Sequence, residues 1–449
     1  MVEVIIFLSI ILFCLLGDKY KVLNIFIFII PFHLFIKSLL TYFYGGGGIF
    51  ASWKELVILI FAYKVFKTDS IAPINKNLRL LFGFFIVLIL IYYLLAKSYG
   101  DALPQLRDHI FPIILFFSVY SISWQEKKFK PTVTAFILGA FLSTIGGFVQ
   151  HYFLNVPIST IKGTIDFIDA SGYIQYTTTS PRIMGMERMS GLLSGPNDFG
   201  VYLALMLSFC IFFLYSKASI SQLSRRRLLF IRVATISILI CLLLSFSRAG
   251  WAIAVFSIGL LVIRRRIKIN KKVIFNSVLF IFLLVVFIIA NFPSAFDIIT
   301  NSLSGKEESA AARSESFTTG IEKNYSEPFG HGLGTADNRS ALHEFFVESA
   351  FLNISYEISV IGLLTLLLIH IFIVRTLRRR YKVSFFASLA AALSSASIIA
   401  SFVSINTYGM PYIYLWWLML GLGLNGSFAL DTGSSEEEEP VEKYSLLNE

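Results

Sequence analysis

Arginines beside apolar segments are the residues of this sequence best suited to binding an anion. Arg188 lies shortly before Pro196 and Asn197, which mark a predicted helix start. A helix N-terminus beside an arginine is a natural anion site. Arg248 stands in a short turn between two apolar segments, where its planar guanidinium can hold a phosphate by two hydrogen bonds. The alternatives are a plain loop and cap for Arg188 and a snorkelling side chain for Arg248.

The long polar segment before residue 348 adds further candidates. Arg313 is predicted to begin a helix within it, and 328–334 (PFGHGLG) is a glycine-rich turn whose backbone can approach a ligand closely. His331 in that turn and Glu348 at the next apolar boundary are candidate general bases. His343 is a candidate for substrate binding, although a loop histidine is often only solvated.

Arg107 and Asp108 open another apolar segment. Charge at such a boundary is costly and therefore often functional, so Arg107 is a candidate for substrate binding. The alternative is an ion pair between these two neighbours at the membrane interface.

Metal chemistry has no support in the sequence, which contains no HExxH, DxD or paired CxxC motif. The cysteines Cys14, Cys210 and Cys241 all lie inside apolar segments, where they are expected to behave as small buried hydrophobic residues. We therefore expect neither a metal nor a cofactor.

The elements that must position these residues are membrane helices. The chain is 56% hydrophobic and 15% charged, with a mean hydropathy of +0.74, which leaves too little polar surface for a soluble globule. Spans of about 20 residues cross a bilayer as helices. The sequence predicts an all-α, polytopic integral membrane bundle of about 12–13 transmembrane helices. The predicted spans are 4–17, 22–42, 53–66, 79–96, 105–122, 131–152, 197–216, 228–246, 250–264, 273–291, 348–374, 383–404 and 409–425.

Charge between the spans predicts the orientation. Most Lys and Arg fall in alternate loops, which the positive-inside rule places in the cytoplasm, so the net charge of +10 does not indicate nucleic-acid binding. The large loop 292–347 then faces outward, as does 153–196. The membrane domain is expected to cover 1–432, and the acidic tail 433–449 is expected to be disordered and cytoplasmic.

Four motifs in sequence resemble the O-antigen ligase/polymerase superfamily, the Wzy-type and WaaL-type membrane glycosyltransferases of bacteria. They are RMSGLLSGPNDFGVYLAL (188–205), LSFSRAGW (244–251), ARSESFTTGIEKNYSEPFGHGLGTAD (312–337) and ESAFLNISYEISVIGLL (348–364). The resemblance implies a GT-C-like fold in the cytoplasmic membrane, with an active site on the outer face. It also implies undecaprenyl-diphosphate-linked saccharides as donors, within a lipid membrane.

Two activities fit this resemblance. A polymerase transfers the growing glycan to another lipid-linked repeat unit, and a flippase and a chain-length regulator are then expected partners. A ligase transfers it to lipid A core or to protein. Ligases of the superfamily typically carry a functional histidine where this chain has Glu348, which favours a polymerase. The rival from a different class is a transporter or lipid flippase, which would need charge at mid-membrane depth and internal symmetry.

Overall fold

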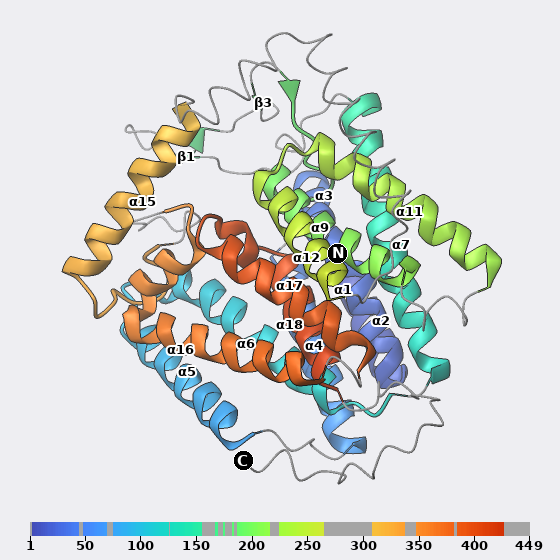
Figure 1. The fold of residues 1–449 in the computed structure, drawn as a ribbon, viewed down its shortest axis with the longest axis horizontal. Coiled ribbons are helices and arrows are strands. Elements are labelled where there is room, and N and C mark those ends of the chain that lie inside the picture. Colours follow the sequence, from blue (N-terminus) through green and yellow to red (C-terminus); the bar gives the residue numbers. More distant parts are fainter. Residues whose placement is uncertain are drawn as a thin grey trace.

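The computed structural model describes residues 2–44, 48–69, 75–124, 126–154, 167–168, 174–175, 182–183, 186–215, 224–264, 308–336, 347–380 and 384–425. Helices dominate this part of the chain (Figure 1). In the first half they are α1 (Val2–Leu16), α2 (Lys19–Ile29), η1 (Ile30–Phe32), α3 (His33–Tyr44), η2 (Phe50–Ser52), α4 (Trp53–Thr68), α5 (Lys76–Leu94), α6 (Tyr99–Ser121), α7 (Glu126–Val149) and η3 (Gln150–Leu154). In the second half they are α9 (Pro196–Tyr215), α11 (Arg225–Leu244), α12 (Arg248–Ile263), α15 (Glu308–Ser326), α16 (Ala350–Arg380), α17 (Phe385–Ser401), η4 (Ile405–Tyr408) and α18 (Tyr412–Leu424).

These helices confirm the predicted all-α membrane bundle. Within the described residues, 6 helical segments are long and apolar enough to cross a membrane, and shorter apolar helices accompany them. The 6 are Lys19–Tyr44, Lys76–Leu94, Lys128–Phe153, Pro196–Tyr215, Arg225–Leu244 and Ala350–Arg380. Every predicted span except 273–291 coincides with a helix or a run of helices; that span and the tail 433–449 lie outside the described residues.

Local chemistry sets where many helices begin. An N-cap side chain accepts a hydrogen bond from an amide of the first turn, which satisfies a donor that the helix leaves unpaired. The N-caps that do so are Asp18 for α2, Asn75 for α5, Ser98 for α6, Ser224 for α11 and Ser247 for α12. The starts of these five helices are therefore fixed by residues close in sequence.

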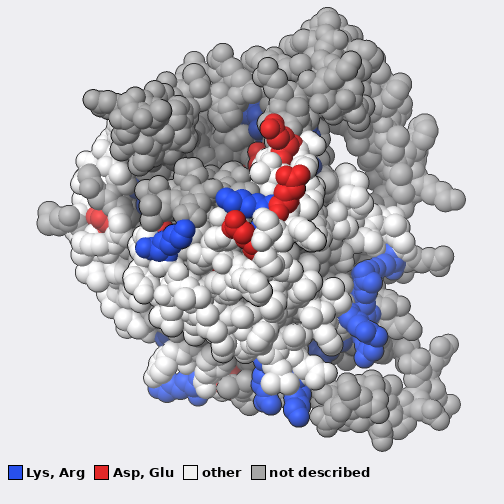
Figure 2. Space-filling view, turned by 90° about the vertical axis from the view of Figure 1, so that its left-hand side faces the viewer, with Lys and Arg blue, Asp and Glu red and all other residues white. Residues whose placement is uncertain are grey.

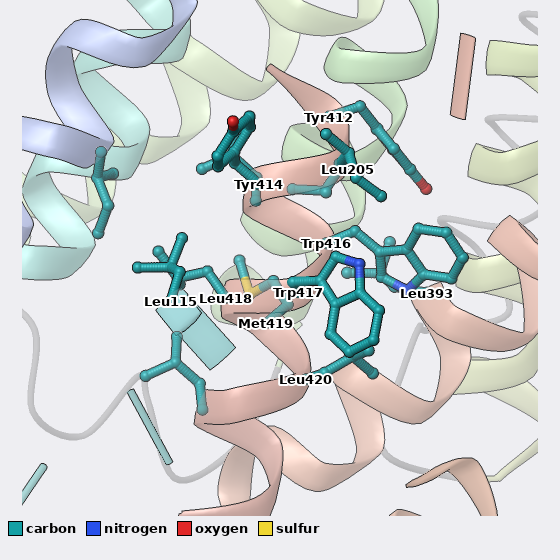
Figure 3. Close-up of a cluster of buried hydrophobic side chains, with 14 of the residues drawn as sticks. Leu115, Leu205, Leu393, Tyr412, Tyr414, Trp416, Trp417, Leu418, Met419 and Leu420 are labelled. Carbon is teal, nitrogen blue, oxygen red and sulfur yellow. The ribbon is translucent and has the colours of Figure 1, made fainter. Parts of the chain in front are cut away.

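The helix α18 forms the centre of the bundle, with every residue from Tyr412 to Leu424 buried. Its Trp416, Trp417 and Met419 pack among leucines of other helices (Figure 3). Figure 1 shows α17 and α18 in the middle, with α5 and α16 along one side and α7 and α11 along the other. Because η4 immediately precedes α18, the end of this central helix lies where many elements meet.

The surface pattern fits a membrane environment. Seen from the side of α5, α15 and α16, a broad band of the surface is uncharged, with charged residues of both signs above it and several Lys and Arg along its lower edge (Figure 2). Large apolar side chains are exposed on α5 and α16. An apolar band of this extent is stable in contact with lipid, whereas soluble proteins rarely expose one to water.

Short strands occur in the predicted outward loop 153–196. β1 (Phe167–Ile168) pairs with β2 (Ile174–Gln175), and β3 (Arg182–Ile183) pairs with β4 (Met186–Glu187), both antiparallel. Each strand has only two residues, so the fold class stays all-α.

Candidate functional site

The short helix η4 joins several helix ends at one end of the bundle. It lies against α9, α16, α17 and α18. Asn406 Nδ2 donates to Asp198 Oδ1 of α9 at 2.7 Å, and Thr407 Oγ1 lies 2.8 Å from Ser401 Oγ of α17. Thr407 is fully buried. The start of α9 and the end of α17 are thus held together through η4.

Arg188 fastens the start of α9 to the turn between α11 and α12. Its Nη2 donates to Asn197 Oδ1 at 2.7 Å and to the carbonyl of Phe246 at 3.2 Å, and its Nε donates to the carbonyl of Ser245 at 3.0 Å. The helix α9 begins at Pro196, as predicted, while the Asn197 side chain turns to Arg188. Several hydrogen bonds therefore fix the guanidinium of Arg188 between two helix starts.

Arg248 is the first residue of α12 and its side chain is exposed. Ser247 caps the helix by accepting from the amide of Gly250 at 3.2 Å. The first turn of α12 contains no acidic residue. The guanidinium of Arg248 and the partial positive charge of the helix N-terminus repel each other. An anion bound there would be attracted to both.

Glycines bring the starts of α9 and α12 into direct contact. A Cβ built on Gly250 would lie 2.6 Å from the carbonyl carbon of Gly200, and one built on Gly200 would lie 2.2 Å from Ser247 Cβ. Only residues without a Cβ allow the two helix N-termini to lie this close. The positive ends of both helices therefore face the same region as Arg188 and Arg248.

Substituting Gly250 tests this close approach. Gly250→Ala is expected to push α9 and α12 apart and to lower the free energy of unfolding by about 1–3 kcal/mol. Thermal unfolding in detergent measures the effect. Gly259→Ala on the same helix is the matched control, since a Cβ there meets nothing within 4 Å. Equal melting temperatures for the two variants would contradict the packing argument.

Glu348 lies at the start of α16, beside residues that lead back to η4. Ser349 Oγ accepts from the amide of Leu352 at 3.3 Å and lies 3.4 Å from the carbonyl of Ser401, to which it donates. Asn353 exchanges hydrogen bonds with the backbone of Val347 at 2.8 and 3.0 Å. Glu348 itself is partly buried. The backbone around Glu348 is therefore fixed by hydrogen bonds from the side chains of Ser349 and Asn353.

The glycine-rich turn 328–336 is held by backbone hydrogen bonds rather than left open. Its amides donate to the carbonyls of Tyr356 and Glu357 on α16 and Tyr92 on α5, at 2.9, 3.1 and 3.2 Å. Gly330, Gly332 and Gly334 have φ values of 74°, 98° and 87°, which favour glycine. The sequence predicts this turn, but the partners of these amides are protein carbonyls.

His331 is packed against other residues of this region. Its ring stacks on Tyr356 with centroids 4.1 Å apart, and its Nε2 is paired with Glu327. Lys323 of α15 lies 5.1 Å from the same Tyr356 ring. The loop contains the predicted helix, α15, and Arg313 lies within it; the Arg313 side chain and the whole of His343 are outside the described residues.

Arg107 takes part in a buried charge cluster between α4 and α6. Its Nη1 lies 3.7 Å from Glu55 Oε1, which also accepts from Lys54 Nζ at 2.6 Å. Asp108, the neighbour in sequence, lies 3.5 Å from the hydroxyl of Tyr414 on α18. Lys54 and Glu55 are both buried. The guanidinium thus meets a carboxylate from a different helix.

Glu55 balances two cations in this cluster, so its charge should matter for stability. Glu55→Gln is expected to lower the free energy of unfolding by about 2 kcal/mol, because Lys54 and Arg107 lose their shared anion in a buried setting. Thermal unfolding in detergent provides the measurement. Glu322→Gln on the exposed side of α15 is the control, with no expected change. An unchanged melting temperature for Glu55→Gln would show that the cluster adds no stability.

The structure brings some predicted residues together and separates others. Arg188 bonds to Asn197, whose neighbour Asp198 accepts from Asn406 of η4. Arg248 follows Ser247, whose hydroxyl donates to the carbonyl of Asn197 at 3.5 Å, and Glu348 precedes Ser349, which donates to Ser401 beside η4. His331 belongs to the turn 328–336, which contacts α16 farther along that helix, at Tyr356 and Glu357. Arg107 lies with Glu55. We call the first set the η4 site.

Glu357 and Asn406 have structural roles that were not assigned from the sequence. Glu357 is 3% exposed and its carboxylate accepts from the turn 328–336. The sequence feature that could have identified Glu357 is a carboxylate inside an apolar helix, because such residues are rare and usually functional. Asn406 has no such signal, because its partner Asp198 is remote in sequence.

Metal ligands do not gather in the described part of the chain, where no group of three or more His, Cys, Asp or Glu could hold an ion. The described residues of the η4 site offer guanidinium groups, helix N-termini and a carboxylate.

Comparison with known families gives a match over part of the chain. Residues 233–356 match the family model described as O-Antigen ligase, and the match includes Arg248, Arg313, His331 and Glu348. This segment is similar to the family that the motifs predict, and the family model supports a glycosyltransferase-like enzyme of the ligase or polymerase type. No curated protein gives a significant match to the chain.

Proposed function

We propose that this protein is a polysaccharide polymerase. It transfers a glycan from an undecaprenyl-diphosphate-linked donor to a lipid-linked repeat unit, at the outer face of the cytoplasmic membrane of a bacterium. The observation that carries the proposal is the η4 site, where two arginines at helix starts and a carboxylate are joined through one short helix.

The arginines would act on the donor. In the transfer, the acceptor hydroxyl oxygen bonds to the anomeric carbon, the bond from that carbon to the diphosphate oxygen breaks, and the lipid diphosphate leaves with the electron pair. Negative charge grows on the leaving group, and preorganised cations stabilise it in the transition state. Arg188 and Arg248, near the N-termini of α9 and α12, would supply such charge, and hydrogen bonds to Ser245, Phe246 and Asn197 hold Arg188 in place.

The carboxylate would act on the acceptor. A hydroxyl attacks more readily when a base takes its proton, and Glu348 is the base we assign. His331 is the second candidate, but it is already stacked on Tyr356 and paired with Glu327. Arg313 from the large loop would be a third cation that stabilises the leaving diphosphate. His343 from the same loop and Arg107 on α6 would contribute to substrate binding.

A ligase is the second candidate, because the matching family model is described as O-Antigen ligase. Glu348 favours the polymerase, since ligases are expected to carry a histidine at this place. A transporter or flippase is less favoured, because it is expected to show internal symmetry and the sequence contains no internal repeat.

Reconstitution tests the proposal. The full chain in liposomes is given undecaprenyl-diphosphate-linked repeat units, and the products are separated by size. Longer lipid-linked glycans made without another protein are the expected result. Transfer only when lipid A core is added would favour the ligase, and movement of the donor across the bilayer without glycan transfer would favour the flippase.

A further inference from the structure

The helix α16 is broken in its first half, and the turn 328–336 enters the break. Ile358 (φ −120°, ψ 19°) and Ser359 (φ 76°, ψ 162°) depart from helical geometry. A positive φ at serine is strained and must be held by its surroundings. Backbone groups freed in an apolar helix need partners, because lipid offers none. The turn supplies them: the amides of His331 and Gly332 donate to the carbonyls of Tyr356 and Glu357, and Val360 donates to Pro328.

Glu357 adds a side-chain contact at the same place. Its Oε1 accepts from the amides of Gly334 at 3.0 Å and Ala336 at 3.2 Å. A buried carboxylate is stable only with such donors, and charged acceptors make the stronger hydrogen bonds. The turn and the carboxylate therefore depend on each other.

The fit of the turn allows little movement. A Cβ on Gly330 would lie 2.6 Å from the amide nitrogen of Ser359, and one on Gly334 would lie 2.8 Å from the carbonyl carbon of Asp101 on α6. The hydroxyl of Tyr92 also donates to the carbonyl of Phe329. The turn is thus wedged between α16 and the α5–α6 connection in one arrangement.

The residues proposed to act on substrate from the large loop are attached to this turn. His331 is part of it and stacks on Tyr356, the residue before Glu357. The helix α15, which carries Arg313, ends at Ser326, directly before the turn. Releasing the turn from α16 would free His331 and remove one attachment of α15, which also donates from Asn324 Nδ2 to the carbonyl of Leu352 at 3.2 Å.

We propose that Glu357 is a positioning residue, which locks the 328–336 turn into the break of α16 and thereby fixes His331 and the C-terminal end of α15 relative to α16. The inference rests on the proposed function for its consequence in catalysis. The lock itself is a property of the fold and can be tested separately.

Thiol labelling tests the lock. The natural cysteines are all buried, so a water-soluble maleimide should report on an introduced cysteine. Thr335→Cys is expected to be protected, because Thr335 is 3% exposed in the docked turn. Adding Glu357→Ala is expected to speed its labelling about tenfold or more, whereas Glu357→Gln, which keeps an acceptor oxygen, is expected to restore protection. Ser326→Cys, at an exposed position, is the control that labels in every background.

A second variant guards against misfolding of Glu357→Ala. Gly334→Ala leaves Glu357 in place but displaces the turn, and it should expose Thr335→Cys in the same way. Labelling of Thr335→Cys that is fast in the parent, or slow in both Glu357→Ala and Gly334→Ala, overturns the lock.

Polymer synthesis tests the consequence. Glu357→Ala is expected to lower kcat about tenfold with a smaller change in KM, and Glu357→Gln is expected to recover most of the rate. Full activity in a Glu357→Ala protein whose turn labels rapidly would overturn the positioning role. A parent that makes no polymer would overturn the proposed function instead, while the labelling result would still decide whether Glu357 holds the turn.

Discussion

Replacing Arg248 by alanine is expected to slow glycan transfer by roughly 10²–10³-fold, the loss seen when one preorganised donor to a developing oxyanion is removed. Arg248 is exposed at the first residue of α12, so the variant should remain folded. The measurement is polymer formation in liposomes under single-turnover conditions, with the melting temperature recorded in parallel. The loss should appear in kcat, because the charge it stabilises develops mainly in the transition state.

Two further variants sharpen this prediction. Arg248→Lys keeps the charge but loses the two-pronged hydrogen bonding, so about a tenfold loss is expected. Arg379→Ala, an exposed arginine at the other end of α16, should leave the rate unchanged. If cells carrying Arg248→Ala make polymer of normal length from a normal amount of protein, the assignment of Arg248 to the donor site is wrong.

The helices could be predicted from the sequence because their signals are local. Apolar length and flanking charge located the spans from 4–17 to 409–425 that lie among the described residues, and Pro196 located the start of α9. The helix around Arg313 and the glycine turn 328–334 also follow from residues close together in the chain. These features depend on the length of an apolar segment and on the helix and turn propensities of its residues, and both can be read from a single segment.

The partners of the candidate residues could not be predicted in this way. Arg107 stands next to Asp108 in the sequence, yet the carboxylate it approaches is Glu55 from another helix. The amide of Leu333 finds the carbonyl of Tyr92, far away in the chain. Such pairings depend on which helices are neighbours, and nothing in one segment's periodicity specifies that.

The arrangement along α16 separates the two candidate bases. From Ser349 to Glu357 the helix rises roughly 12 Å at 1.5 Å per residue. His331 docks beside Tyr356 and Glu357, whereas Glu348 precedes Ser349, whose hydroxyl reaches the end of α17 near η4. A base must lie within hydrogen-bond reach of the proton it removes. The residue on the η4 side is therefore the one we assign to the acceptor hydroxyl.

Glu348→Gln is accordingly expected to lower the rate of transfer by roughly 10²–10⁴-fold, the contribution typical of a positioned general base. Glutamine has the same shape as glutamate and leaves the Ser349 and Asn353 contacts in place, and the melting temperature recorded in parallel separates loss of the base from loss of stability. Glu315→Gln on the exposed side of α15 is the matched control and should keep full activity. Single-turnover transfer to a lipid-linked acceptor is the measurement.

Glu348→His tests whether the residue at this position acts as a general base or has only a structural role. An ordinary imidazole loses its proton near about pH 6.5, so Glu348→His should regain part of the activity as the pH rises through that value, because the neutral imidazole is the form that accepts the proton. Glu348→Gln has no such group and should stay inactive across the range. Equal activity of the two variants at every pH would show that position 348 does not remove the proton, and the search for the base would move to His331. A gain of transfer to lipid A core in Glu348→His would instead show that this position selects the acceptor, because the superfamily's ligases are expected to carry a histidine there.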